Sequence, residues 1–258
     1  RAAGSIAALR PLWAGADRVI FNGDTVETRA RRHRADAARH LDELRRLTAE
    51  DGVELILIAG NHDPLICETD WVTLGGGAVV VTHGDLLHAA VAPWSDLDGE
   101  RENTFDAALS ARGEDRDSAS LSDRADAARR ASVRQWRRQQ LDRFATADRN
   151  VWQRTWRRFR KVLNVLHYWR TFPGLAEEFA HEYFPSCRFF VFGHIHRPGV
   201  WLGPAGVDGR PPVAVINTGA FAFPRRPRAV VIVDGRVTFW KVRFNRRRGH
   251  RLSRSPMQ

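Results

Sequence analysis

Short, nearly continuous apolar runs alternate with helical patterns in the first third of the chain. The apolar runs predict strands at 17–22, 53–60 and 77–85. Apolar residues that recur every three positions from Ala38 to Leu47 predict an amphipathic helix over 29–49, and a shorter helix is expected over 5–12. Strands that are apolar on both faces need a covering layer on each side of their sheet. The pattern therefore predicts an α/β fold.

A different pattern occupies residues 93–187. Residues 101–123 are polar and predict a mobile loop or a frayed helix. The long helix expected next has one apolar face, whose members are spaced alternately by four and three residues. These members are Trp152, Trp156, Phe159, Leu163 and Leu166. We interpret 93–187 as a helical, basic insertion rich in tryptophan.

Strand patterns resume after this insertion. The runs lie at 187–193, 212–217, 228–233 and 236–244. The Asp234-Gly235 pair between the last two runs predicts a tight hairpin turn. The final residues, 245–258, are basic and predict a disordered tail. The sequence thus predicts a core made of 1–92 and 188–244, interrupted by the insertion.

Positive charge is concentrated in two segments. The chain carries a net charge of +11, of which residues 121–170 contribute +10 and residues 241–258 contribute +7, so the remainder is acidic. Four of the nine tryptophans also lie in 121–170. This mixture suits peripheral contact with an anionic membrane, and also nucleic acid through phosphate contacts and base stacking. A helical cap with solvated arginines remains the third interpretation.

Two further observations bear on the class of protein. No run of about 18 apolar residues is present, so no transmembrane helix is predicted. Cys67 and Cys187 are far apart and outside any C-x-x-C pattern, which argues against a disulfide scaffold and a cysteine zinc site. This use of cysteine indicates a reducing compartment, and we expect a cytoplasmic protein.

Polar loops follow four of the predicted strands. They are Gly23-Asp24, Gly60-Asn61-His62-Asp63, His83-Gly84-Asp85 and Gly193-His194-Ile195-His196. Because ligands gather at the carboxyl ends of strands in open α/β sheets, we expect the loops to converge. Their carboxylate, amide and imidazole groups suit Mn, Fe, Zn, Co or Ni. In the last loop an extended backbone would point His194 and His196 the same way.

The series GD, GNHD, HGD and GHIH, in this order, resembles the calcineurin-like metallophosphoesterase family. The resemblance covers most of the chain outside the insertion. It implies a β-sandwich flanked by helices, with two divalent metal ions such as Mn, Fe or Zn that serve the hydrolysis of phosphate esters or anhydrides. Such a metal pair activates a water molecule and stabilises both the attacking and the leaving oxygen.

The resemblance also implies a role for each loop residue. Asp24 would bridge the two metals and His196 would bind one of them. The ligands of the other metal would be Asn61, His83 and His194. His62 would donate a proton to the leaving oxygen or pair with the phosphate, and Asp63 would orient it.

One motif of that family is missing. An Asp-x-His on the opening strand should supply two ligands to the metal that His196 serves, and residues 1–22 contain no such motif. Because the chain begins at Arg1, we expect the motif upstream. In this chain we expect a weak or empty second metal site and a sheet without its first strand. The alternative is a one-metal or inactive relative.

The place of the insertion, between HGD and GHIH, resembles the UDP-diacylglucosamine pyrophosphohydrolases. Those enzymes typically carry arginine at the position of His62, so their substrate is not transferred. The leading hypothesis is a metal-dependent phosphoesterase for a phosphorylated small-molecule or lipid-like substrate. The alternatives are a nuclease or nucleotide phosphodiesterase, and a catalytically degenerate relative that binds membrane or nucleic acid through its basic segments.

Overall fold

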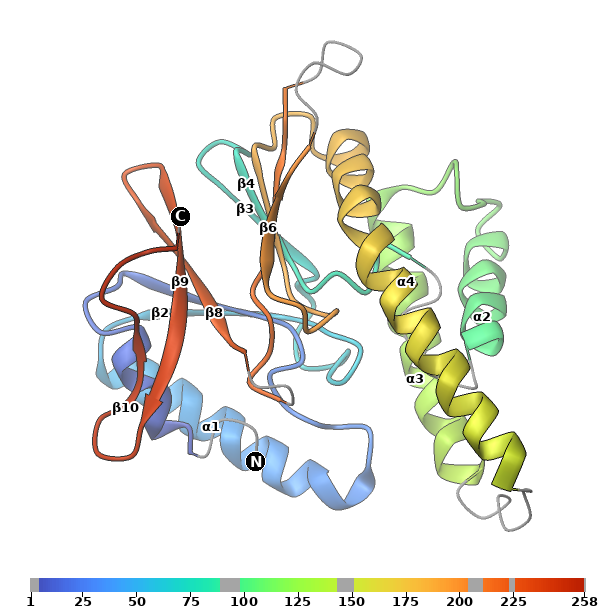
Figure 1. Cartoon of the computed structure of the whole chain (residues 1–258), viewed down its shortest axis with the longest axis horizontal. Helices are drawn as coiled ribbons and strands as arrows, with labels where there is room; N and C mark the ends of the chain where they lie inside the picture. The colour runs from blue at the N-terminus through green and yellow to red at the C-terminus, as the bar shows by residue number, and fades with distance from the viewer. Residues whose placement is uncertain (1–4, 89–97, 143–150, 204–210, 223–225, 258) are drawn as a thin grey trace. The chain divides into compact units, whose positions relative to one another are not determined.

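The computed structural model describes residues 5–88, 98–142, 151–203, 211–222 and 226–257, with side chains described outside 98–102, 138–142 and 151–161. The chain forms two compact units (Figure 1). The first comprises the residues up to Gly84 and those from Glu177 on, and the second comprises Asp85–Ala176. The second unit is therefore inserted into the first, and it begins and ends earlier in the chain than the expected insertion over 93–187.

The first unit contains the strands and the shorter helices. In chain order they are η1 (Ala7–Leu12), β1 (Arg18–Asn22), η2 (Arg31–His33), α1 (Arg34–Glu50), β2 (Glu54–Ile58), β3 (Trp71–Leu74), β4 (Val79–Thr82), β5 (Phe189–Phe192), β6 (Gly199–Leu202), β7 (Ala214–Asn217), β8 (Arg228–Val233), β9 (Arg236–Asn245) and β10 (Gly249–Leu252). The strands form a parallel pair β1-β2, a mixed sheet β3-β4-β5-β7-β6 and an antiparallel sheet β10-β9-β8. Within the mixed sheet, β4, β5 and β7 are parallel, and the two edge strands are antiparallel to their neighbours.

Side chains from all three sheets share one apolar core. Its buried members are Ile58, Val79, Val81, Val191, Ile216 and Phe239. A second cluster packs η1 and α1 against β1 and β2 through Leu9, Trp13, Leu44, Leu47 and Val53. The sheets therefore pack with their apolar faces together, and helices cover the outer face of the β1-β2 pair.

The sequence predictions for this unit hold for its central elements. Each predicted apolar run contains an observed strand, and Asp234 and Gly235 both have positive φ angles, 50° and 75°, in the turn between β8 and β9. The expected short helix over 5–12 is a 3-10 helix, η1. The edge strands β3 and β6 were not predicted, because neither lies within a longer apolar run of the sequence, and both are only partly buried.

The prediction of a disordered tail over 245–258 is wrong for the residues that the structure describes. Strand β10 pairs with β9, and the loop between them is held by the Asn245 side chain, whose Oδ1 accepts hydrogen bonds from the amides of Arg247 and Arg248. The buried His250 ring packs on Phe221 and Phe244, with ring centroids 5.1 and 4.9 Å apart. The packing of the buried His250 ring thus orders a segment that its highly charged composition predicted to be disordered.

The second unit is helical. It contains α2 (Asp98–Ser110), α3 (Leu121–Asp142) and most of α4 (Val151–Tyr183) (Figure 1). The polar segment 101–123, predicted as a loop or frayed helix, contains most of α2, whose residues Phe105 and Leu109 are fully buried one helical turn apart. The Arg112 guanidinium also pairs with Asp123 and Asp126 at the start of α3.

Helix α4 confirms the predicted long helix, but its described buried face is a different one. Leu163 and Leu166 of the predicted apolar face are about half exposed, at 49% and 52%. Tyr168, Phe172 and Ala176 are buried instead. The side chains of Trp152, Trp156 and Phe159 lie outside the described residues. None of the described helices has an apolar stretch long enough to cross a lipid bilayer.

Candidate functional site

Four polar loops lie at the carboxyl ends of strands in the first unit. Asp24 follows β1, Asn61 follows β2, His83 follows β4 directly, and His194 follows β5. Strands β1 and β2 are parallel to each other, as are β4 and β5, so the loops of each pair leave the same end of their sheet. Through this topology, residues up to 170 positions apart in the chain come together.

Three of these side chains approach one atom of the fourth, Nε2 of His83. It lies 3.1 Å from Oδ1 of Asn61, 3.2 Å from Nδ1 of His194 and 3.4 Å from Oδ1 of Asp24. His83, Asn61 and His194 are buried, and the Asp24 side chain remains 19% exposed. Asp24 is therefore the member of the group that a ligand from solvent could reach.

The hydrogen bonding of His83 fixes the character of this meeting point. Its Nδ1 lies 3.0 Å from the carbonyl oxygen of Asn22, so Nδ1 carries a proton and donates it. In a neutral ring Nε2 then has a lone pair, which faces the oxygens of Asn61 and Asp24. A cation at this point, either a proton on Nε2 or a metal ion among the donors, would offset the repulsion between these lone pairs.

This donor set fits a first-row divalent metal in its chemistry. One carboxylate oxygen, one amide oxygen and two imidazole nitrogens are the ligands that Mn, Fe, Co, Ni and Zn accept. Across residues 5–88 and the other described ranges, no three His, Cys, Asp or Glu side chains are already arranged as a metal site. Asn61 is not one of those residue types, and the group would have to open slightly around an ion.

The electrostatics around Asp24 favour its ionised form. Burial by itself would raise the pKa of this carboxyl, but the nearby His83 and His62 rings and a hydrogen bond from the His62 amide lower it to about 2. That amide donates to Oδ1 of Asp24 over 2.8 Å. A carboxylate is thus available at the site throughout the neutral pH range.

The backbone is strained at three predicted site residues. Asp24, His194 and His196 have φ angles of 50°, 52° and 56°, in the left-handed region that non-glycine residues seldom adopt. Strained residues of this kind cluster at functional sites, where the surrounding structure holds them in place. The GHIH loop is therefore not extended as the sequence suggested. His196 lies two residues beyond His194, half-buried, and is not among the four side chains that meet.

Gly23 permits the close packing of this site. Its φ is +87°, and a Cβ atom at this position would lie 2.4 Å from the His83 ring. Only glycine allows the loop after β1 to lie directly against the imidazole. Both residues of the GD motif therefore have a role in the site: Gly23 permits the close packing, and Asp24 supplies the carboxylate.

His62 is oriented by Glu27 and not by Asp63. Its Nδ1 lies 2.9 Å from Oε2 of Glu27, and its Nε2 lies 3.9 Å from Oδ2 of Asp24. Burial would raise the pKa of Glu27, but hydrogen bonds from His62 and Arg29 outweigh it and hold this pKa below its usual range. Glu27 was not predicted from the sequence, because its only signal is a carboxylate three residues after the GD motif.

Asp63 holds the loops together. Its side chain is fully buried, and its two oxygens accept hydrogen bonds from the backbone amides of Asp24, Gly60 and Val26, each 3.0 Å long. Burial, followed by the Asp24 carboxylate, raises the pKa of Asp63 to about 7. The residue fixes the loop that carries Asp24, so it positions the site without facing His62.

Two asparagines support the GHIH loop. The buried Asn217 donates through Nδ2 to the Gly193 carbonyl, and its Oδ1 accepts a 2.7 Å hydrogen bond from the Gly219 amide. Asn22 donates to the Thr218 hydroxyl over 3.1 Å and thereby links the ends of β1 and β7. The position of Asn217 at the end of an apolar run was the only sequence signal for this role.

No model of a known protein family matches the chain, and no curated protein is similar to it at a significant level. The functional conclusion therefore depends on the geometry of the site.

Proposed function

We propose that the protein is a metal-dependent hydrolase of phosphate esters or diphosphates, built on a metallophosphoesterase-type β-sandwich. The observation that carries the proposal is the convergence of Asp24, Asn61 and His194 on Nε2 of His83, within 3.4 Å. These four side chains would hold one metal ion, and His196 with Asp24 would contribute to a second. The bound ions would supply Lewis-acid activation of water and neutralise phosphate charge.

His62 fits the role of proton donor to the leaving oxygen. The Glu27 carboxylate accepts the proton on Nδ1, so Nε2 is the atom that remains to exchange a proton with a substrate. Nε2 lies beside Asp24, and the His62 side chain is 31% exposed, so a phosphate ester could reach both groups. A phosphorylated small-molecule or lipid-like substrate is therefore our proposal, and a nucleic acid phosphodiester is the alternative.

The proposal is tested by hydrolysis of p-nitrophenyl phosphate and bis-p-nitrophenyl phosphate with added Mn²⁺, together with metal analysis. We expect turnover by the wild type. Asp24→Asn should lose both activity and bound metal, because the amide lacks the charge that holds the cation. His62→Ala should lose about 10²–10⁴-fold in rate, as for a general acid, while it keeps the metal.

Asp234→Asn is the matched control. Asp234 also has a left-handed backbone, with φ of 50°, but it lies in the turn between β8 and β9. This variant should keep both activity and metal. Absence of turnover with every divalent metal would reject the enzyme, and a protein that binds metal without turnover would be the degenerate relative. Normal metal content in Asp24→Asn would reject the proposed ligand set.

A further inference from the structure

The hairpin β9-β10 carries a row of cations on one face. Arg243 and Arg251 are cross-strand partners, and Lys241 lies two residues from Arg243 on the same strand face. All three side chains are exposed, whereas Val242 and His250 on the opposite face are buried. Arg246, Arg247 and Arg248 form the exposed turn between the strands. We call these six residues the basic hairpin.

The basic hairpin has no internal compensation of its charge. Residues 241–258 contain no acidic residue, and none of the six cations forms an ion pair with any residue in the part of the chain that the structure describes. Like charges directly opposite each other, such as Arg243 and Arg251, destabilise a strand pair. By contrast, three of the four arginines of α1 are paired: Arg39 with Asp36, Arg45 with Asp42 and Arg46 with Glu50. A bound polyanion would remove the repulsion on the hairpin.

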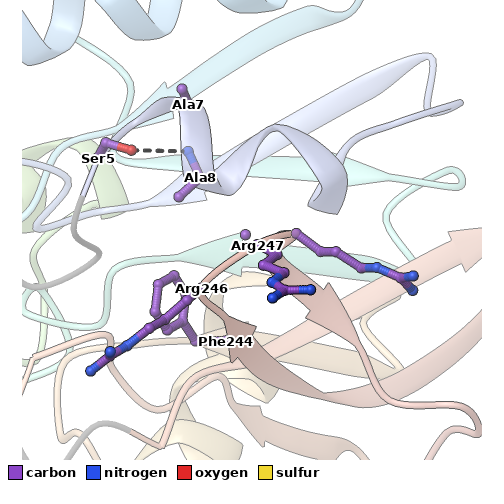
Figure 2. Close-up of a pocket in the computed structure, with 8 residues that line it drawn as sticks. Ser5, Ala7, Ala8, Phe244, Arg246 and Arg247 are labelled. Carbon is purple, nitrogen blue, oxygen red and sulfur yellow. Dashed lines mark hydrogen bonds between the residues drawn. The ribbon is translucent and has the colours of Figure 1, made fainter.

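The turn of the hairpin also borders a pocket of about 390 Å³. Figure 2 shows Ser5, Ala7 and Ala8 on one side of this pocket, and Phe244, Arg246 and Arg247 on the other. Phe244 is 58% exposed, although its ring also contacts His250. An accessible aromatic ring next to guanidinium groups can stack on a flat base while the arginines bind the adjoining phosphate.

The hairpin is held rigidly enough to present this surface. The Asn245 side chain fixes the turn through the amides of Arg247 and Arg248, over 2.9 and 3.2 Å. His250 anchors β10 between two aromatic rings. At Gly249 the return strand lies so close to η1 that a Cβ atom would come within 2.5 Å of the Ala8 carbonyl oxygen.

We propose that the basic hairpin binds single-stranded nucleic acid. A base would stack on Phe244, which lies on the same face as Val242 and His250, with its adjoining phosphates on the arginines of the turn. The cations of the other face would bind phosphates further along the strand. Alternate residues on a strand face are about 6.8 Å apart, a spacing comparable to that of successive phosphates along an extended strand. A membrane surface is the less favoured partner, because Phe244 is the single large apolar side chain exposed among residues 241–257 of this hairpin. This surface is separate from the proposed metal site, and its function does not depend on that proposal.

The test is fluorescence anisotropy of the full chain with a labelled oligo(dT) strand over a range of salt concentrations. The triple variant Arg246→Ser, Arg247→Ser, Arg248→Ser keeps Asn245 and Gly249 of the turn. It should weaken binding at least about tenfold and reduce the slope of log K against log[salt] by about 2, as expected for three lost phosphate contacts. Phe244→Leu keeps the apolar packing on His250 but loses the ring. It should weaken binding about tenfold through lost stacking.

The matched control removes the same charge from α1, as Arg39→Gln, Arg45→Gln, Arg46→Gln. We expect less than a twofold change in affinity. An equal loss in this control, or no binding by the wild type at low salt, would overturn the proposal.

Binding to vesicles of phosphatidylglycerol and phosphatidylcholine tests anionic lipid as the other partner of this surface. Vesicle binding that the hairpin triple variant abolishes, with oligo(dT) binding unchanged, would assign the surface to anionic lipid instead.

Discussion

At the scale of single residues, the candidate site combines groups that are unfavourable alone. Three non-glycine residues of the site have left-handed backbones, and Nε2 of the buried His83 lies within 3.4 Å of oxygens of Asn61 and Asp24. Each arrangement has a cost, about 1–3 kcal/mol for a strained backbone residue. The buried Asp63 carboxylate offsets part of it through its three backbone hydrogen bonds. Specific side chains such as Asp63 thus stabilise the strained backbone, and each can be substituted separately.

Glu27 allows a test of this network by pH. Its pKa is lowered from the usual 4.5, so the stability it contributes is present above about pH 4.5 and is lost as the pH falls through the lowered value. Glu27→Gln should therefore be less stable than the wild type at pH 7, and the difference should shrink below pH 4.5. Urea unfolding at several pH values measures this difference in the free energy of unfolding. Glu68→Gln, at an exposed position, is the control. A difference that is constant with pH would show that Glu27 does not stabilise the fold by its charge.

At the scale of elements, each loop of the candidate site depends on the strand that precedes it. Strands β1, β2, β4 and β5 end one to three residues before the residue that joins the site. Apolar runs predicted these strand ends within two or three residues. Strands β3, β6 and β10 were not predicted, because, unlike the equally short β4, β5 and β7, they do not lie within a longer apolar run of the sequence.

Asn217 links the end of β7 to the GHIH loop. Asn217→Ala would leave the Gly219 amide without its acceptor, at a cost of up to about 1–3 kcal/mol, and would remove one of the two hydrogen bonds to the Gly193 carbonyl, which keeps the bond from the Ile195 amide. We expect a lower free energy of unfolding and faster amide hydrogen exchange over residues 193–196. Asn217→Asp is the paired comparison, since it keeps the acceptor for Gly219 but faces the Gly193 carbonyl with oxygen. Asn217→Asp should also lower the stability of the GHIH loop. Unchanged exchange in both variants would mean that the loop is held by other contacts.

At the scale of the whole molecule, the candidate site and the basic hairpin both lie in the sheet-containing unit. A metal that binds only the folded form stabilises it by about 2.7 kcal/mol at a concentration of 100 times its Kd. Mn²⁺ should therefore raise the melting temperature of the wild type, and EDTA should reverse the change. Asp24→Asn should show no shift. Calorimetry of both proteins makes the measurement, and an equal shift in the variant would place the metal elsewhere.

The sequence by itself determined the α/β class, most strands, the hairpin turn at Asp234-Gly235 and the four loops with metal-ligand chemistry. These follow from local information, since apolar runs and turn residues act within a few positions of the chain. Only the tertiary structure decided that Asp24, Asn61 and His194 converge on His83, that Glu27 orients His62, and that Asp63 instead binds backbone amides. It also decided that the basic tail is ordered. Such contacts join residues that are distant in the chain, so they are set by sheet topology and burial, which local patterns do not encode.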